Sequence, residues 1–105
     1  MNFASDNITG AAPEILDAIQ AGNDGALLPY GNDDVTRAAE AKVAQVFETE
    51  AEVFFVATGT AANALAISAA TPPWGVIFCH AGAHINDTEG TAPEFFSGGA
   101  KLIAL

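Results

Sequence analysis

The sequence predicts an α/β protein in which parallel strands are joined by helical crossovers. Apolar runs suited to strands, at residues 52–57, 76–80 and 101–105, are separated by segments that contain helical patterns. The 18 residues of the first connection, 58–75, leave room for a helix. A connection of that length favours a parallel pair over an antiparallel hairpin.

Two helices are predicted before the first strand. Pro13 stands at a favoured first position, and apolar residues follow at helical spacing until Gly22, which predicts a helix over residues 13–21. After a loop rich in Gly, Asn and Asp, either Asp33 or Asp34 is suited to cap a second helix. One face of this helix is apolar, so we expect it to pack along a single stripe. The stripe consists of Val35, Ala39, Val43, Val46 and Phe47.

The middle of the chain passes from strand to helix through a short turn. The predicted strand at 52–57 ends in Thr-Gly-Thr at residues 58–60, and a helix of small residues follows at 61–70. Two prolines at 72–73 must end that helix because they cannot continue it. The second and third strands then follow.

Composition excludes several classes of partner. Thirteen Asp and Glu against three Lys and Arg give a formal net charge of -10, which disfavours nucleic acid and membrane surfaces. A single cysteine, Cys79, and the lack of an export signal predict a cytoplasmic protein. Residues 53–86 carry no charged side chain, but Gly, Asn and Pro interrupt them, so no transmembrane helix is predicted.

The last predicted strand, at 101–105, gives an expectation about the extent of the protein. An apolar strand with nothing after it leaves a sheet edge uncovered, which is an aggregation hazard. We therefore expect the chain to be the N-terminal part of a larger protein.

Two groups of polar residues follow the first two predicted strands. They are Thr-Gly-Thr at 58–60 and the segment 80–84. Because the carboxyl ends of parallel strands lie on one edge of a sheet, where ligands bind, we expect both groups on that edge. A turn into a helix N-terminus offers free N–H groups to a phosphate, and Thr hydroxyls add donors. The same turn is also compatible with an ordinary N-cap, and both interpretations stay open.

His84 stands in the second of these groups. An imidazole there is suited to stack on a flat cofactor ring or to act as a general base near neutral pH. A lone histidine is also commonly a surface residue, and this alternative stays open.

Five short segments extend these indications, in order along the whole chain. They are SDNITGAAPEIL, YGND, ATGTAAN, AHINDTEG and PEFFSGGAKL. This pattern resembles the threonine aldolases of the β-eliminating lyase type, enzymes of the pyridoxal-phosphate fold-type I superfamily. The resemblance implies the N-terminal part of the large domain of an aspartate-aminotransferase-like subunit. Residues 1–50 would form a helical segment with an interface loop, and residues 51–105 would begin the cofactor-binding domain.

The resemblance also implies roles for individual residues. Gly59 and Thr60 would hold the phosphate of the cofactor together with Thr58, which stands where the family more often has serine. His84 would lie over the pyridine ring and assist proton transfer at the substrate hydroxyl. Ser5 would help to bind the substrate carboxylate.

Other matched residues are assigned less specific places. Tyr30 and Asp33 would belong to a loop near the substrate and the subunit interface, with a solvated turn as the alternative. Glu89 would orient neighbouring groups or lie at the surface. Asp6 and Asn7 are as well suited to capping the first turn of chain as to a part in the binding assigned to the neighbouring Ser5. No metal site is predicted.

The implied reaction is the cleavage of L-threonine or a related β-hydroxy-α-amino acid to glycine and an aldehyde, with pyridoxal 5'-phosphate as cofactor. The full-length parent would be a homodimer or homotetramer. Neither Lys42 nor Lys101 matches the lysine to which the family attaches its cofactor, so we expect this chain to be inactive by itself. The alternatives are a small phosphate- or anion-binding module without catalysis, and the remnant of a truncated gene.

Overall fold

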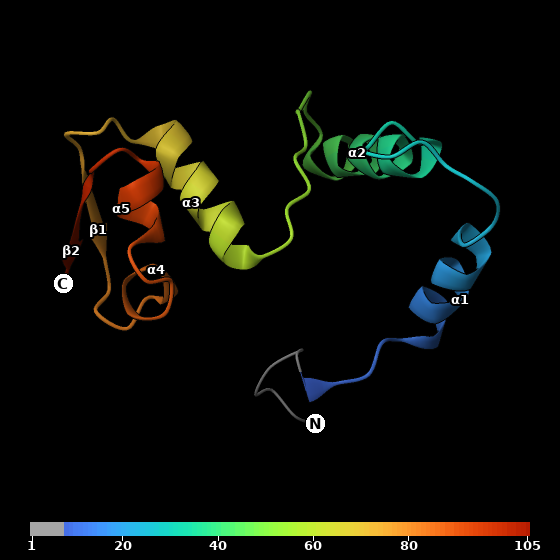
Figure 1. The fold of residues 1–105 in the computed structure, drawn as a ribbon, viewed down its shortest axis with the longest axis horizontal. Helices are drawn as coiled ribbons and strands as arrows, with labels where there is room; N and C mark the ends of the chain where they lie inside the picture. The colour runs from blue at the N-terminus through green and yellow to red at the C-terminus, as the bar shows by residue number, and fades with distance from the viewer. Residues whose placement is uncertain (1–7) are drawn as a thin grey trace. The chain divides into compact units, whose positions relative to one another are not determined.

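The computed structural model describes residues 8–105, which fall into two compact units divided between Val53 and Phe54 (Figure 1). Ser5, Asp6 and Asn7 lie outside the described residues. Within residues 8–105, no helix is both long and apolar enough to cross a membrane.

The first unit contains two helices, both of which were predicted. Helix α1 spans Pro13–Gly22 and begins with the expected proline, and helix α2 spans Asp34–Phe47. In the described chain the apolar stripe of α2 is not buried, because the helix buries no residue and Phe47 is 70% exposed, so its packing stays a prediction. Neither helix of this unit buries a residue, so the stripe is not covered by α1.

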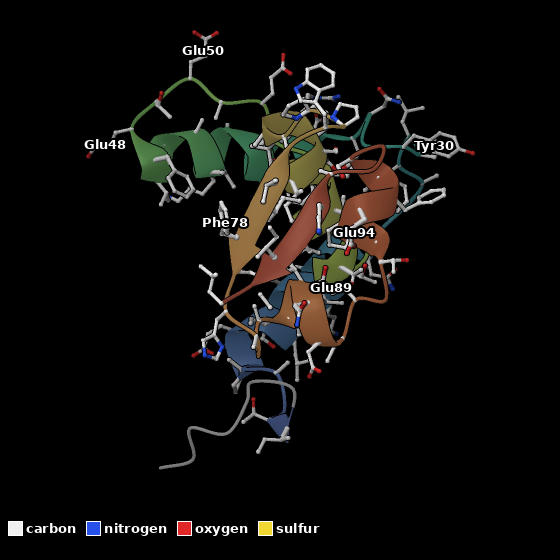
Figure 2. The ribbon with its side chains drawn as sticks, turned by 90° about the vertical axis from the view of Figure 1, so that its left-hand side faces the viewer. Tyr30, Glu48, Glu50, Phe78, Glu89 and Glu94 are labelled. Atoms are coloured by element: carbon white, nitrogen blue, oxygen red, sulfur yellow. The ribbon has the colours of Figure 1, made fainter. Side chains whose placement is uncertain are left out.

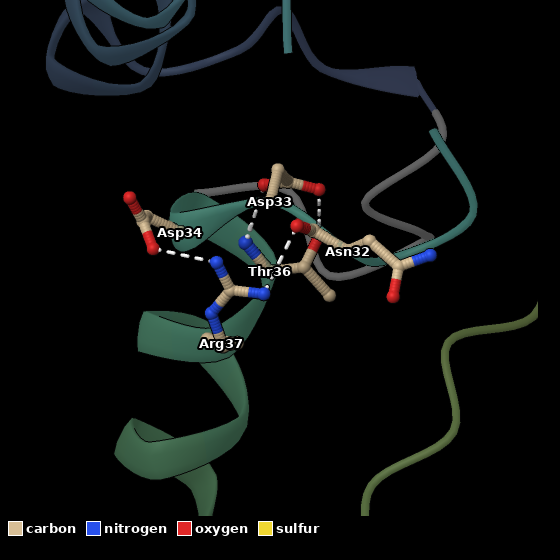
Figure 3. A network of polar contacts seen from close by, with 5 residues as sticks. All are labelled: Asn32, Asp33, Asp34, Thr36 and Arg37. Atoms are coloured by element: carbon tan, nitrogen blue, oxygen red, sulfur yellow. Dashed lines mark hydrogen bonds and ion pairs between the residues drawn. The ribbon is translucent and has the colours of Figure 1, made fainter. Parts of the chain in front are cut away.

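The beginning of α2 is fixed by Asp33, one of the two caps that the sequence suggested. Its carboxylate accepts hydrogen bonds from the N–H of Thr36 at 2.8 Å and from the Thr36 hydroxyl at 2.7 Å (Figure 3). These two bonds lower the pKa of Asp33 below its usual value. Arg37 donates to Asp34 at 2.7 Å and to the carbonyl of Asn32 at 2.9 Å, which ties the preceding loop to the first turn (Figure 3).

The second unit combines three helices with a two-stranded sheet. Its elements are α3 (Gly59–Ala70), β1 (Val76–Cys79), α4 (His84–Asp87), α5 (Ala92–Phe96) and β2 (Lys101–Ala104). The strands predicted at 76–80 and 101–105 are confirmed, and they pair in parallel with Val76 opposite Lys101. The short helices α4 and α5 form the crossover between them, and no helix was predicted there.

The strand predicted at 52–57 was wrong, because these residues form no regular element. A strand exists by hydrogen bonding to a neighbour, and the sheet of the described chain contains only β1 and β2. The apolar residues Phe54, Phe55 and Val56 instead line one wall of a groove of about 650 Å³, whose other wall is α3. The apolar run therefore indicated contact with other apolar groups, not strand pairing.

The core of the second unit is small and lies where α5 contacts both α3 and β2 (Figure 1). Ala64 of α3, Pro93 of α5 and Ala100 before β2 are almost completely buried. Because alanine and proline are compact, the helices approach each other and the sheet closely. On the other side of the sheet, Phe78 projects away from β1 and is 65% exposed (Figure 2).

Two glycines turn the chain from α5 into β2. Gly98 and Gly99 have φ angles of 76° and 118°, which side chains with a Cβ rarely adopt. The N–H of Gly99 donates to the carbonyl of Glu94 at 2.8 Å and closes the end of α5. The parallel pairing then begins with a bond of 3.0 Å from Lys101 N–H to the Gly75 carbonyl.

Candidate functional site

The turn at residues 58–60 is the first part of the site, and it is the beginning of a helix. Thr58 is the N-cap of α3, with extended backbone angles, and its hydroxyl oxygen accepts the N–H of Ala61 at 3.1 Å. The helix therefore starts at Gly59, two residues before the predicted start. The N–H groups of Gly59 and Thr60 have no partner among the described residues and lie at the positive end of the helix dipole.

Gly59 leaves open space at this helix end. A Cβ placed on it would meet no atom within 4 Å, and its φ lies outside the positive range. The local backbone therefore does not require glycine at this position. Because a Cβ tilts toward the N-terminus of its helix, any larger residue would project into the space in front of the free N–H groups.

The second part of the site is a cluster of three polar side chains. Glu89 Oε1 lies 2.7 Å from His84 Nδ1 and accepts a hydrogen bond of 2.6 Å from Asn63 Nδ2. Asn63 belongs to α3 and stands about one turn after Thr60. The cluster thus connects the imidazole at the start of α4 to the helix that begins with the open N–H groups.

The reversal between α4 and α5 places Glu89 in this cluster. Gly90 and Thr91 both have left-handed backbones, with φ angles of 57° and 61°, and they turn the chain directly after Glu89. Glu89 lies between the two short helices (Figure 2) and is only 7% exposed to solvent. Its second oxygen, Oε2, is buried without a hydrogen-bond partner among the described residues.

The electrostatics of the cluster keep Glu89 ionised at neutral pH. The hydrogen bond from His84 is the main cause that lowers the pKa of Glu89, and the bond from Asn63 acts in the same direction against the opposing effect of burial. A carboxylate only accepts hydrogen bonds, so the proton between the two groups is assigned to His84 Nδ1. The other ring nitrogen, Nε2, belongs to a side chain that is 68% exposed.

The structure brings together some of the predicted residues. His84 and the helix that starts at Gly59 are linked, although not by two strand ends as the sequence argument assumed, because the first strand is absent. For Glu89, buried contact with His84 favours the orienting role over the surface one. Sequence reasoning missed Asn63 as a member of the cluster, and its place at the end of the ATGTAAN segment was the only indication available.

Other predicted residues lie elsewhere. Tyr30 is 97% exposed with a left-handed backbone, and it belongs with Asp33 to the first unit, so a place near the site stays a prediction for both. Ser5 lies outside the described residues. Lys42 donates to Gln45 within α2, and Lys101 is exposed at the amino end of β2, the opposite end of the sheet from the segment that leads to His84.

Comparisons with known proteins extend over nearly the whole chain. A family model described as "Beta-eliminating lyase" matches residues 2–105. The chain is 45% identical over 101 residues to the low specificity L-threonine aldolase of Pseudomonas aeruginosa, and 44% identical over 101 residues to that of another Pseudomonas species. Each match covers 96% of this chain and 29% of the relative, so the chain spans less than a third of the length of these curated relatives.

Proposed function

The chain belongs to the β-eliminating lyase family, and on that basis we propose that it carries part of the active site of a pyridoxal-phosphate-dependent aldolase. The proposed substrates are L-threonine and related β-hydroxy-α-amino acids, which are cleaved to glycine and an aldehyde. The observation that carries the proposal is the link through Glu89, which joins His84 to the helix whose N-terminus is suited to a phosphate.

The residues at the start of α3 fit the phosphate of this cofactor. The N–H groups of Gly59 and Thr60 have no acceptor within the described part of the chain, and the side of Gly59 is open. The Thr58 hydroxyl accepts from Ala61, and its own proton remains available for donation to a phosphate oxygen. Thr58, Gly59 and Thr60 are therefore the proposed cofactor-binding residues.

His84 is the proposed group for proton transfer and for contact with the cofactor ring. Its Nδ1 is engaged by Glu89, so Nε2 is the nitrogen that can accept a proton. We assign Nε2 the proton of the substrate β-hydroxyl, whose removal lets the oxygen form a carbonyl as the Cα–Cβ bond breaks. When bound, pyridoxal phosphate supplies an electron sink for the pair left at Cα.

The complete site is proposed to need more than these residues. Lys42 is engaged in α2 and Lys101 lies at the far end of the sheet, so neither is assigned as the lysine that carries the cofactor. Substrate binding through Ser5 and Tyr30, the domain assignment of residues 51–105, assembly into dimers or tetramers and a cytoplasmic location belong to the same proposal.

Calorimetry of the 105-residue chain tests the phosphate site. We expect saturable uptake of pyridoxal 5'-phosphate and no comparable uptake of pyridoxal, which has the same ring without the phosphate. Borohydride treatment should yield no stoichiometric adduct at a defined lysine, and threonine should not be cleaved. Equal uptake of the two compounds would contradict the assignment of residues 58–60.

Two further results would redirect the proposal. A stoichiometric adduct at Lys42 or Lys101 with threonine cleavage would show that the chain is active alone, contrary to our expectation. Inorganic phosphate that binds as tightly as the cofactor would favour the alternative of a simple anion-binding module, because the ring would then add nothing to the affinity.

A further inference from the structure

Glu89 is the one ionisable residue that is buried among residues 8–105. Burying a carboxylate is costly unless hydrogen bonds satisfy it, and here both bonds converge on a single oxygen while Oε2 has no partner among residues 8–105. An apolar side chain of similar volume would avoid this cost. The arrangement therefore suits the control of a neighbouring group better than it suits stability.

The neighbouring group is His84, and the second histidine of the chain, His80, serves as a comparison. His80 Nδ1 lies 3.0 Å from the N–H of Gly82 and accepts its hydrogen bond, which places the His80 proton on Nε2. His84 Nδ1 faces the carboxylate oxygen of Glu89, which can only accept, and this places the His84 proton on Nδ1. The hydrogen-bond partners thus favour opposite tautomers for the two imidazoles.

We infer that Glu89 is a positioning residue that holds His84 with its proton on Nδ1 and its lone pair on Nε2. The role in the reaction rests on the proposed function, in which Nε2 accepts the substrate proton. Asn63 adds the second half of the arrangement, because its bond to the same oxygen fixes the carboxylate to α3. Two hydrogen bonds in series then set the position of the imidazole relative to the start of α3.

NMR of the chain labelled with ¹⁵N-histidine tests the inference without cofactor. At a pH well above about 6.5, where an ordinary imidazole is neutral, the ring nitrogen shifts report the tautomer directly. We expect an Nδ1–H tautomer for His84 and an Nε2–H tautomer for His80. The same tautomer for both histidines would overturn the inference.

Three variants separate positioning from packing. Glu89→Leu removes the acceptor and should change the tautomer of His84 but not that of His80. Glu89→Gln keeps an oxygen that can accept from both His84 and Asn63, so it should preserve the Nδ1–H form. Glu94→Leu is the matched control, because Glu94 also has a buried oxygen without a partner in the described structure and makes no bond to either histidine. An unchanged His84 tautomer in Glu89→Leu overturns the inference.

The same variants address the reaction in any form of the protein that cleaves threonine. Glu89→Leu should lower kcat, by no more than the roughly 10²- to 10⁴-fold that a general base contributes, with a much smaller change in KM. Glu89→Gln should recover a large part of this loss. A change confined to KM, or equal losses in both variants, would contradict a positioning role.

The results for the inference and for the proposed function can be told apart. If the two histidines show opposite tautomers but the chain takes up no pyridoxal phosphate, the proposed function would be overturned. The positioning of His84 by Glu89 would still be supported. Uptake of the cofactor with both histidines in one tautomer would overturn this inference and leave the proposed function standing.

Discussion

Gly59 allows stability and binding to be separated by a single methyl group. In the folded chain a Cβ at this position meets nothing within 4 Å, and its φ is outside the positive range, so Gly59→Ala should fold without strain. At such a position alanine stabilises a protein by about 0.4–1 kcal/mol, mainly because the unfolded chain has fewer conformations to lose. We therefore expect a higher free energy of unfolding for this variant.

The effect on phosphate binding should have the opposite sign. The added Cβ tilts toward the N-terminal end of α3, in front of the free N–H groups. Displacement of the phosphate from one of these donors would remove a hydrogen bond to a charged group, worth about 1.5–3 kcal/mol. This corresponds to a rise in Kd of about 10- to 150-fold.

The assay combines urea denaturation, followed by circular dichroism, with calorimetry using pyridoxal 5'-phosphate. Gly22→Ala is the matched control, since Gly22 is also helical, has equally open surroundings and lies in the other unit. It should raise stability similarly and leave the Kd unchanged. A less stable Gly59→Ala chain would refute the structural reasoning, and an unchanged Kd would refute the phosphate assignment.

Two further predictions concern the cap of α3 and the buried carboxylate. Thr58→Ala removes the bond from the Ala61 N–H and should lower the free energy of unfolding, measured by urea denaturation, by about 1 kcal/mol. Thr58→Ser keeps the hydroxyl and should retain most of that stability, and equal stability of the two variants would argue against the cap. The pKa of Glu89 is lower in the folded chain than its ordinary value of 4.5. Ionised Glu89 should therefore contribute its full stabilisation above about pH 4.5, and this stabilisation should be lost as the pH falls through the pKa of the folded state. Stability curves against pH should therefore fall less steeply below pH 4.5 for Glu89→Leu than for the unmodified chain, and identical slopes would contradict the shift.

The parts of the fold that the sequence predicted are those fixed by local chemistry. Pro13 and Asp33 mark the starts of α1 and α2, because proline suits a first turn and an aspartate oxygen can accept the free N–H groups there. The strands at Val76–Cys79 and Lys101–Ala104 were also predicted, since apolar β-branched and aromatic runs between turn residues suit a sheet. These signals need only a few neighbouring residues.

The parts that were missed depend on contacts distant in the sequence or on very short elements. The run at 52–57 looked like a strand, but apolar composition does not reveal whether a hydrogen-bonding neighbour exists. Helices of four and five residues, such as α4 and α5, are too short to show a helical period. The start of α3 was placed too late because Gly59 and Thr60 are weak helix formers, whereas the Thr58 cap decides the boundary.

The site itself divides in the same way. His84 and residues 58–60 were predicted as site residues from their chemistry and from the resemblance, but the contact between Asn63 and Glu89 spans 26 positions and has no periodic signature. Only folding shows that the two segments share one carboxylate oxygen. Glu89 could therefore be recognised as a candidate for orientation, but the sequence did not show that its partner is His84.

The charge of the chain restricts how an anion can be held at this site. The net charge is -10, and Lys101, the only Lys or Arg in the second unit, lies at the amino end of β2. Within the second unit, the proposed phosphate would therefore be held by oriented N–H groups and hydroxyls, which act over short distances and not through a long-range attractive field. Such binding depends on close approach, and under the proposed function the open space beside Gly59 would permit it, although the local backbone does not demand a glycine there.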